Sequence, residues 1–279
     1  MADTLSRAVG RKTKPFRVQS LPGFTTVAVL CFVVLYAPLF PLVFYSFNAG
    51  ESIAVFKGFS WRWYESAWAN EQVKEVTIRS LVVASFASGI ATTLSTLAAL
   101  GTTRTEPFKG QTFIYVIINQ PLMVPEIVTG VALLVFFAMI KVATGYTGLA
   151  YLIAAHTAFC IPFAYLPIRA RLEGMDKTLE AAAADLYATP WQAFRRVTLP
   201  LMAPGIVAGA MLAFVISLDD VVITELVKAA GQDTLPTYML GQIRRAITPE
   251  INAISTALLA VTVILLTVIF FLSRKKEQA

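Results

Sequence analysis

Residues 203–227 read APGIVAGAMLAFVISLDDVVITELV. An α-helix rises 1.5 Å per residue, so about 20 apolar residues cross a hydrocarbon core of about 30 Å, and this stretch is long enough to do so. Five further stretches have a similar length and composition, and the sequence therefore predicts an all-α integral membrane protein with six membrane-spanning helices. The predicted spans are Thr25–Asn48, Val76–Leu100, Thr112–Val142, Thr147–Ile168, Ala203–Val227 and Ile251–Ser273.

The composition excludes a water-soluble globular domain. The 279 residues are 57% hydrophobic and 14% charged, whereas a soluble domain carries about 25% charged residues. We expect one membrane domain over residues 25–273, between short tails at 1–24 and 274–279. Pro121 and Pro125 interrupt the third span, and because proline removes a helix hydrogen bond, a kink or break is expected there.

Lys and Arg concentrate in alternate segments between the spans, which is the pattern that orients a membrane protein. The segments that carry 15 of the 23 basic residues are the N-terminal tail, the loop after span two, the loop after span four and the C-terminal tail. We therefore expect both termini and these two loops to be cytoplasmic. The net charge of +6 is explained by this asymmetry and by lipid contact, so no nucleic-acid partner is expected.

Metal and nucleotide sites are not expected on this chain. Cys31 and Cys160 fall in predicted spans and are typical of small apolar residues there. His156 is the only histidine, and it is predicted to form a hydrogen bond between packed helices. The sequence has no Gly-rich phosphate loop of the G-x-x-x-x-G-K-[ST] type, so any ATP and Mg²⁺ would be bound by another chain.

The loop over residues 169–202 is too long for a simple turn and carries two helix signals. Asp176 can cap a first helix over Lys177–Leu186, in which apolar residues recur at helical spacing. Thr189-Pro190 then predicts a second helix, with Thr as the N-cap and Pro at the first helical position. Leu199-Pro200 is expected to end that helix, so the loop should form a two-helix knob.

This loop resembles the cytoplasmic loop of permease subunits in ABC importers. The family pattern is E-A-A, three residues, G, nine residues, I, one residue and L-P, and the segment from Ala181 to Pro200 fits that spacing without a gap. In the family this loop docks into a cleft of the ATPase subunit. The resemblance implies an ATPase-coupling role for Glu180, Ala181, Ala182, Ala183, Asp185, Leu186, Tyr187, Ala188, Thr189, Leu199 and Pro200.

Two residues depart from the family pattern. Ala181 stands at the Glu position, with Glu180 one residue earlier, and Tyr187 stands at the Gly position. Glycine there permits a bend with positive φ, which a bulky residue resists. The joint between the two helices is therefore expected to differ from the family's, or the ATPase cleft to have adapted.

Six further motifs resemble the polyamine (spermidine/putrescine) branch of the family. They are Trp63-Tyr64, Pro125-Glu126-Ile127, the segment Ala155–Cys160, the segment Ser217–Asp220, Thr234-Leu235-Pro236 and the segment Thr248–Ala253. The resemblance implies a bacterial inner-membrane complex of two homologous permease subunits, two ATPase subunits and an external solute-binding protein. It also implies alternating access as the transport mechanism, and no covalent chemistry on this chain.

Three acids lie within the predicted spans: Glu126, Asp219 and Asp220. An acid at the middle of a membrane costs about 2.5–3.5 kcal/mol on insertion scales, so it is a candidate for function. Ser217, Asp220 and Thr224 are spaced as one polar stripe on a helix, and Asp219 points about 100° away. We interpret these five residues as a pathway for a cationic solute; the alternative is that each acid holds a neighbouring helix.

Other functions remain open on the sequence alone. Related permeases carry amino-phosphonates, iron or other organic cations. An intramembrane aspartyl protease needs facing carboxylates on separate helices, which Asp219 and Asp220 do not provide, although Glu126 with Asp220 would. An ion-coupled carrier would need no ATPase-docking loop and usually shows inverted repeats, and we find no clear repeat.

The charge asymmetry makes the topology testable. A reporter that fluoresces only in the cytoplasm, fused after Ala279, should give a signal, because the excess of positive charge retains both termini on that side. A fusion after Phe56, in the predicted external loop, is the matched control and should be dark. A correctly inserted Ala279 fusion without fluorescence would contradict the six-span topology.

Overall fold

The computed structural model describes residues 23–52, 55–245 and 248–277, and these residues form an all-helical protein with a single isolated β-bridge between Asn48 and Phe59. The first helices are α2 (Phe24–Tyr36), α3 (Leu39–Tyr45), α4 (Arg62–Ala69), α5 (Glu71–Thr103), α6 (Gln111–Met123), α7 (Glu126–Thr144) and α8 (Ala150–Glu173). The others are α9 (Thr178–Asp185), α10 (Pro190–Ala193), the π-helical turn η2 (Phe194–Thr198), α11 (Leu199–Asp219), α12 (Val222–Val227), α13 (Leu235–Arg245) and α14 (Pro249–Glu277). The predicted fold class is confirmed.

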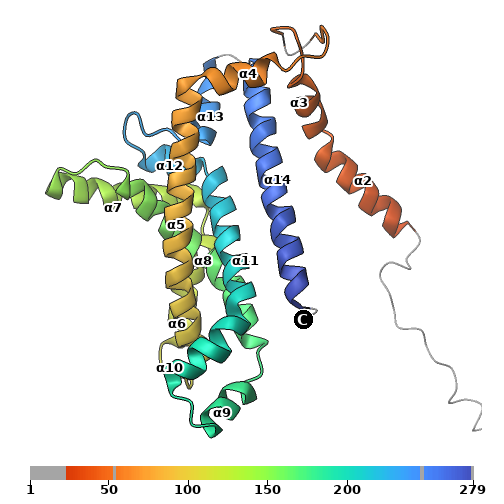
Figure 1. The fold of residues 1–279 in the computed structure, drawn as a ribbon. Helices are drawn as coiled ribbons and strands as arrows, with labels where there is room; N and C mark the ends of the chain where they lie inside the picture. The colour runs from red at the N-terminus through yellow and green to blue at the C-terminus, as the bar shows by residue number, and fades with distance from the viewer. Residues whose placement is uncertain (1–22, 53–54, 246–247, 278–279) are drawn as a thin grey trace, which may run out of the picture.

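Among the described residues, five helices are long and apolar enough to cross a membrane, and a sixth span results if the bent pair α2 and α3 counts as one. The pair bends by 42° at the break that contains Pro38. Figure 1 shows α2 diverging from the other helices. Most of its large apolar side chains are accordingly exposed, because no other described segment packs over them. Most of the predicted N-terminal tail lies outside the described residues.

The core is formed by α5, α8 and α11, which pack along one another (Figure 1). Small residues allow this close approach: a Cβ on Gly209 of α11 would lie 2.6 Å from the carbonyl oxygen of Ala164 in α8. Between α5 and α8, the Ser95 hydroxyl donates to the carbonyl of Ile161 over 2.8 Å. Small residues and interhelical hydrogen bonds are the usual means of helix association in membranes.

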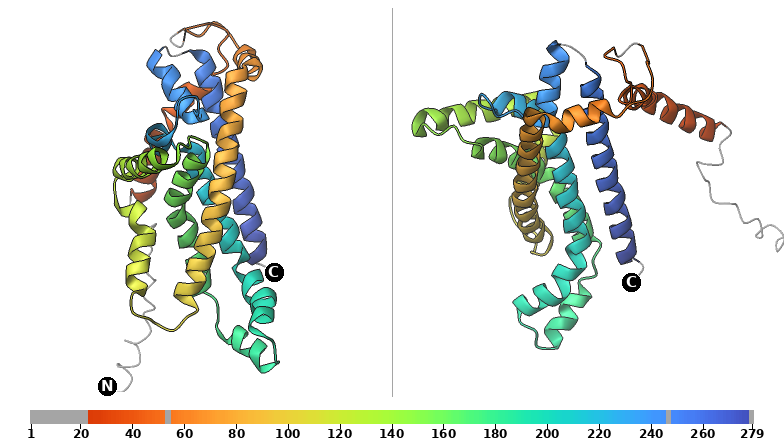
Figure 2. Two further views of the ribbon diagram at one scale, coloured as in Figure 1. Left: turned by 90° about the vertical axis from the view of Figure 1, so that its left-hand side faces the viewer. Right: turned by 45° about the horizontal axis from the view of Figure 1, so that its top comes forward.

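The third predicted span is not one helix. It consists of α6 and α7, separated by Val124 and Pro125 in extended conformation, and Figure 2 shows α7 running across the direction of α5. The break follows from Pro125, because proline disfavours a helical conformation of the residue before it. Pro121, by contrast, lies inside α6 without ending it.

The fifth predicted span is also broken. Helix α11 ends at Asp219, Asp220 is extended with ψ 133°, and α12 begins at Val222. The side chain of Asp220 accepts hydrogen bonds from the backbone N–H groups of Ile223 and Thr224. Asp220 therefore caps α12 in the way that Asp commonly caps a helix, and the carboxylate makes the break favourable.

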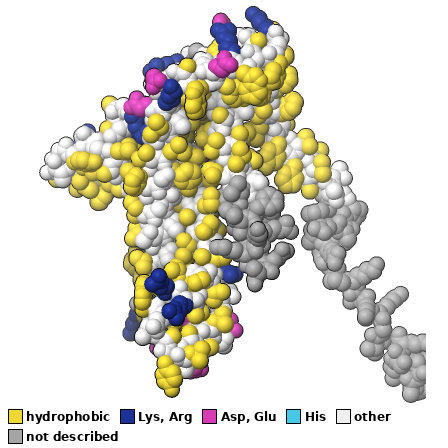
Figure 3. All heavy atoms as spheres, viewed as in Figure 1, with side chains coloured by type: hydrophobic (Ala, Val, Ile, Leu, Met, Phe, Trp, Pro, Cys, Tyr) yellow, Lys and Arg dark blue, Asp and Glu magenta, His cyan; other side chains and the backbone are white. Residues whose placement is uncertain are grey.

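The two ends of the molecule differ. The loop helices α9 and α10 lie at one end, and α4 and α13 lie at the other (Figures 1 and 2). In the space-filling view, apolar side chains dominate the middle of the visible face, and Lys, Arg, Asp and Glu gather toward the two ends (Figure 3). This distribution fits a protein whose middle lies in lipid.

Candidate functional site

The loop after α8 forms two short helices, as predicted. The Asp176 carboxylate accepts from the N–H of Thr178 at 2.9 Å, a bond that lowers the pKa of Asp176. At the second helix, Thr189 is the N-cap, Pro190 follows it, and Gln192 completes a reciprocal capping box. Local sequence signals therefore determine both helix starts.

The second helix does not end at Leu199-Pro200, contrary to the prediction. Helix α10 passes into the π-helical turn η2, which leads directly into α11, so Pro190–Asp219 forms one long element. Pro200 has no N–H to donate to the preceding turn. The wider turn accommodates it: the N–H of Leu199 reaches back to the carbonyl of Phe194, five residues earlier.

Tyr187 has a positive φ, at the position where the family pattern has glycine. Its φ is 57°, the only positive φ at a non-glycine residue among those the structure describes. The N–H of Tyr187 donates to the carbonyl of Ala184, and the N–H of Ala188 donates to that of Ala183. These two bonds form the Schellman motif that closes a helix C-terminus. Tyrosine therefore adopts a positive-φ bend at this joint, and the alternative expectation, an adapted ATPase cleft, stays a prediction.

The outer side of this knob is apolar and uncovered. Tyr187 is 97% exposed and Leu186 is 82% exposed. Trp191 of α10 is 66% exposed and stacks on Phe194. We call Leu186, Tyr187 and Trp191 the knob patch. Large apolar side chains clustered at a surface mark an interaction site.

Glu180 does not belong to this exposed side. Its Oε1 accepts a hydrogen bond from the Thr198 hydroxyl at 2.8 Å and lies 3.3 Å from Nε of Arg104. Arg104 is the C-cap of α5, and Thr198 ends the turn η2. The sequence analysis did not single out Arg104, for which the only signal was a basic residue four positions after the end of a predicted span.

A buried polar cluster forms where α8 meets the α11–α12 break. His156 lies 2.7 Å from the hydroxyl of Ser217 through Nδ1 and 2.9 Å from that of Thr224 through Nε2. Asp220 accepts from the Thr224 hydroxyl at 2.7 Å and lies 3.4 Å from His156 Nε2. All four side chains are buried, and His156 therefore hydrogen-bonds between helices as the sequence indicated.

The three residues of the predicted polar stripe lie close together, but they are not on one continuous helix as expected. Ser217, Asp220 and Thr224 do converge, but across the helix break and not along one continuous helix. They face His156 inside the protein, so in this structure they do not line an open path. The neighbouring acid, Asp219, is exposed at the end of α11. Glu126, in the first turn of α7, is partly exposed and interacts with Asp220.

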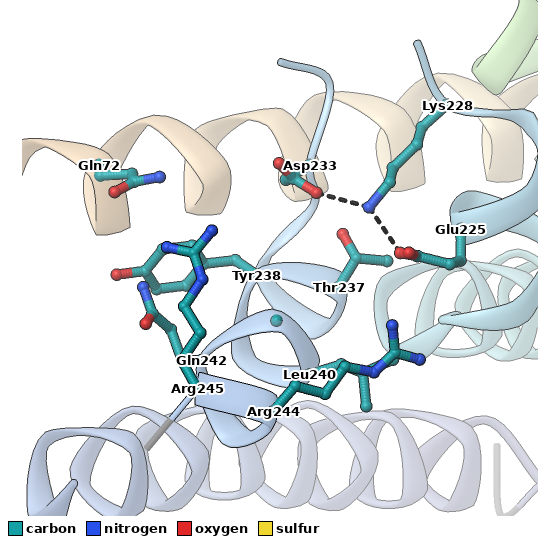
Figure 4. A pocket seen from close by; sticks show the side chains of 11 residues that line it. Gln72, Glu225, Lys228, Asp233, Thr237, Tyr238, Leu240, Gln242, Arg244 and Arg245 are labelled. Carbon is teal, nitrogen blue, oxygen red and sulfur yellow. Dashed lines mark hydrogen bonds and ion pairs between the residues drawn. The ribbon is translucent and has the colours of Figure 1, made fainter. Parts of the chain in front are cut away.

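The end opposite the knob holds a polar pocket of about 230 Å³ (Figure 4). Lys228 bridges two acids there, at 2.6 Å from Asp233 and 2.5 Å from Glu225. Burial alone would lower the pKa of Lys228, but these carboxylates raise it above its ordinary value. Arg244 and Arg245 of α13 line the same pocket, are exposed, and form no ion pair within the described residues. We call this the α13 pocket.

No group of three or more His, Cys, Asp or Glu side chains within the described ranges could hold a metal ion. Most of the described acids pair with hydroxyls, backbone N–H groups or basic side chains, and Glu126 with Asp220 is a pair of two acids only. The arrangement therefore offers an exposed apolar patch at one end, a charged pocket at the other, and helix breaks with acids between them.

The Asp220 cap makes a stability prediction. Asp220→Asn should lower the thermal unfolding midpoint of the detergent-purified protein, because a hydrogen bond to a charged group contributes about 1.5–3 kcal/mol. Asp219→Asn is the matched control, since that side chain is exposed, and it should leave the midpoint unchanged. Scanning fluorimetry of both variants measures the difference. Equal midpoints for the two variants would show that the buried cluster does not stabilise the break.

Comparison with known proteins gives close relatives over most of the chain. It is 35% identical over 260 residues to the putrescine transport system permease protein PotI of Escherichia coli (strain K12), covering 92% of each chain. It is 34% identical over 247 residues to the spermidine/putrescine transport system permease protein PotC of Haemophilus influenzae, covering 88% of this chain and 95% of the relative.

Solved structures of low sequence identity share the fold. A bacterial ABC transporter involved in the import of the acidic polysaccharide alginate matches with a TM-score of 0.70 at 15% identity, covering 89% of this chain and 92% of that one. The MetNI methionine ABC transporter, in inward-facing conformations, matches with a TM-score of 0.61 at 18% identity, covering 74% of this chain and 98% of that one.

The sequence also matches a described family over residues 91–276, which is more than half of the chain. That match includes the two-helix knob, the buried cluster and helix α13. Together with relatives above 30% identity over most of the chain, it establishes the family. The chain belongs to the binding-protein-dependent transport system inner membrane components, the permease subunits of ABC importers.

Proposed function

We propose that this chain moves a polyamine, of the spermidine and putrescine class, across the inner membrane by alternating access. The observation that carries the proposal is its 35% identity over 92% of its length to a putrescine permease. The polyamine-like sequence motifs agree with it. The rival cargoes are amino-phosphonates, iron and other small organic cations.

The acids at the helix breaks suit a cationic cargo. Asp219 is exposed at the C-terminal end of α11, where free backbone carbonyls carry partial negative charge. Glu126 is partly exposed at the α6–α7 break. Transporters commonly place their substrate sites at such broken helices. We assign the pathway to Asp219 and Glu126, and we assign Asp220, Ser217 and Thr224 to positioning the break.

The knob patch is the proposed contact with the ATPase. ATP and Mg²⁺ then belong to that partner, and two copies of it would serve this chain and a homologous second permease. Leu186, Tyr187 and Trp191 expose apolar surface where the rest of the chain does not cover it. Burying such side chains in a cleft contributes about 1.5–3 kcal/mol each, which is sufficient to make the patch a major part of the contact.

The α13 pocket is the proposed contact with the external solute-binding protein. It lies at the end opposite the knob (Figure 1), so a cytoplasmic knob places it outside. Three cationic and two acidic side chains line it, so its net charge is positive, and both acids are already paired with Lys228. The exposed arginines would repel a free polyamine but attract an acidic protein surface. The cargo therefore enters with its binding protein, and not through this pocket.

Uptake measurements test the cargo. Membrane vesicles that contain the complete complex should take up labelled putrescine only when ATP and the binding protein are present. Because the site recognises separated ammonium groups, excess spermidine should compete and an amino-phosphonate should not. Uptake that an amino-phosphonate or an iron chelate suppresses, while spermidine leaves it unchanged, would assign the chain to a rival branch.

Charge neutralisation tests the outer contact. Arg244→Gln combined with Arg245→Gln should slow association of the binding protein several-fold at low salt, because peripheral charges act mainly on the association rate. The difference should shrink at high salt through screening. Lys57→Gln, an exposed cation at the same end, is the matched control. The association rates are measured on the complex in nanodiscs. Equal rates for the double arginine variant and Lys57→Gln would contradict the assignment of the α13 pocket to the binding protein.

A further inference from the structure

The first observation concerns where Glu180 points. Within α9, Glu180 and Ala183 are partly covered and face the bundle, whereas Ala181, Ala184 and Asp185 are exposed. An acid at position 181, where the family pattern has its Glu, would turn about 100° away from the bundle. The one-residue displacement of the acid therefore converts an outward carboxylate into an inward one.

The second observation is that Glu180 connects three elements. Through the Thr198 hydroxyl it is bonded to the last residue of η2, which continues into α11. Through Arg104 it is paired with the C-terminal end of α5. The main packing contacts of α9 are with α10 and η2, so the ion pair with Arg104 is a direct link from the knob to a second spanning helix.

The third observation is that Arg104 depends on this carboxylate. The Arg104 side chain is 13% exposed, and its Nε and Nη2 are buried without a hydrogen-bond partner in the described structure. Arginine stays protonated in proteins, and a charge that is largely removed from water needs a counter-charge. Among the described residues, Glu180 is the only acid within ion-pair distance of it.

From these contacts we propose that Glu180 is a positioning residue, the joint through which movement of the knob reaches α5 and α11 together. It does not touch the ATPase. The knob patch receives the movement on the outer side, and the carboxylate transmits it on the inner side, to two of the three helices that form the core. The proposal rests on the proposed ATPase contact, and it assigns the transmission of movement from the knob to the spanning helices to a residue outside that contact.

Neutral variants separate coupling from docking. Glu180→Gln should leave ATPase association and basal ATP hydrolysis near normal and should lower the amount of solute transported per ATP several-fold. Glu106→Gln, at an exposed acid two residues after Arg104 and outside the knob, is the matched control and should change none of these. Leu186→Ala with Tyr187→Ala should instead weaken ATPase association. If the Leu186→Ala, Tyr187→Ala variant binds the ATPase normally, the proposed ATPase contact is wrong. If it binds weakly but Glu180→Gln transports as much solute per ATP as its control, only the role inferred for Glu180 is wrong.

A double variant distinguishes transmission from simple stabilisation. Glu180→Gln with Arg104→Gln removes the unpaired buried charge, so thermal stability should recover relative to Glu180→Gln alone. Transport per ATP should stay low, because the ionic link is still absent. Recovery of transport together with stability would overturn the proposal and make the pair structural.

If the neutral variants fold poorly, a chemical crosslink in place of the ion pair between positions 104 and 180 tests the same proposal. In a chain with Cys31→Ala and Cys160→Ala, the pair Arg104→Cys and Glu180→Cys should transport poorly when reduced. A short bifunctional thiol linker should restore transport per ATP, since it rejoins α9 to α5. Transport that stays low with the linker in place, or that is already normal in the reduced protein, would overturn the proposal.

Discussion

The close approach of α11 to α8 is the constraint on which the rest of the structure depends. At Gly209 a side chain would collide with the Ala164 carbonyl, and at Gly205 it would meet Arg171 at 2.6 Å. Without Cβ atoms, the two backbones come together. This contact places His156 of α8 against Ser217 and Thr224, so a buried polar cluster can satisfy groups that lipid could not.

The buried cluster stabilises the helix break after α11. Asp220 lies outside α11 and caps α12, and its carboxylate accepts a hydrogen bond from Thr224 beside His156. The preceding residue, Asp219, is left exposed at the end of α11. Two adjacent carboxylates thus differ because of their surroundings alone: Asp220 is buried and caps α12, and Asp219 is exposed.

Sequence periodicity and hydropathy located the membrane helices because both depend on local composition. Capping signals at Asp176 and Thr189 were also readable, since a cap is formed by residues a few positions apart. The break at Asp220 was not readable, because the length and apolar character of residues 203–227 fit one unbroken span. The carboxylate that caps α12 is buried beside His156, which is distant in sequence. The pairing of Arg104 with Glu180 was hidden for the same reason.

Helix continuity explains how one end of the molecule can act on the middle. The π turn η2 joins α10 to α11 without a loop, so the element that begins in the knob at Pro190 ends at Asp219. A rigid helix transmits displacement along its axis, whereas a flexible connection would absorb it.

Tyr187 adds a constraint to this element. A non-glycine residue in the left-handed region costs roughly 1–2 kcal/mol. Tyr187 is 97% exposed, and no contact among the described residues compensates for that cost. The two Schellman hydrogen bonds hold the backbone in place, but glycine would allow them at lower cost. A tyrosine at this position is therefore best explained by a surface outside the chain, against which its ring packs.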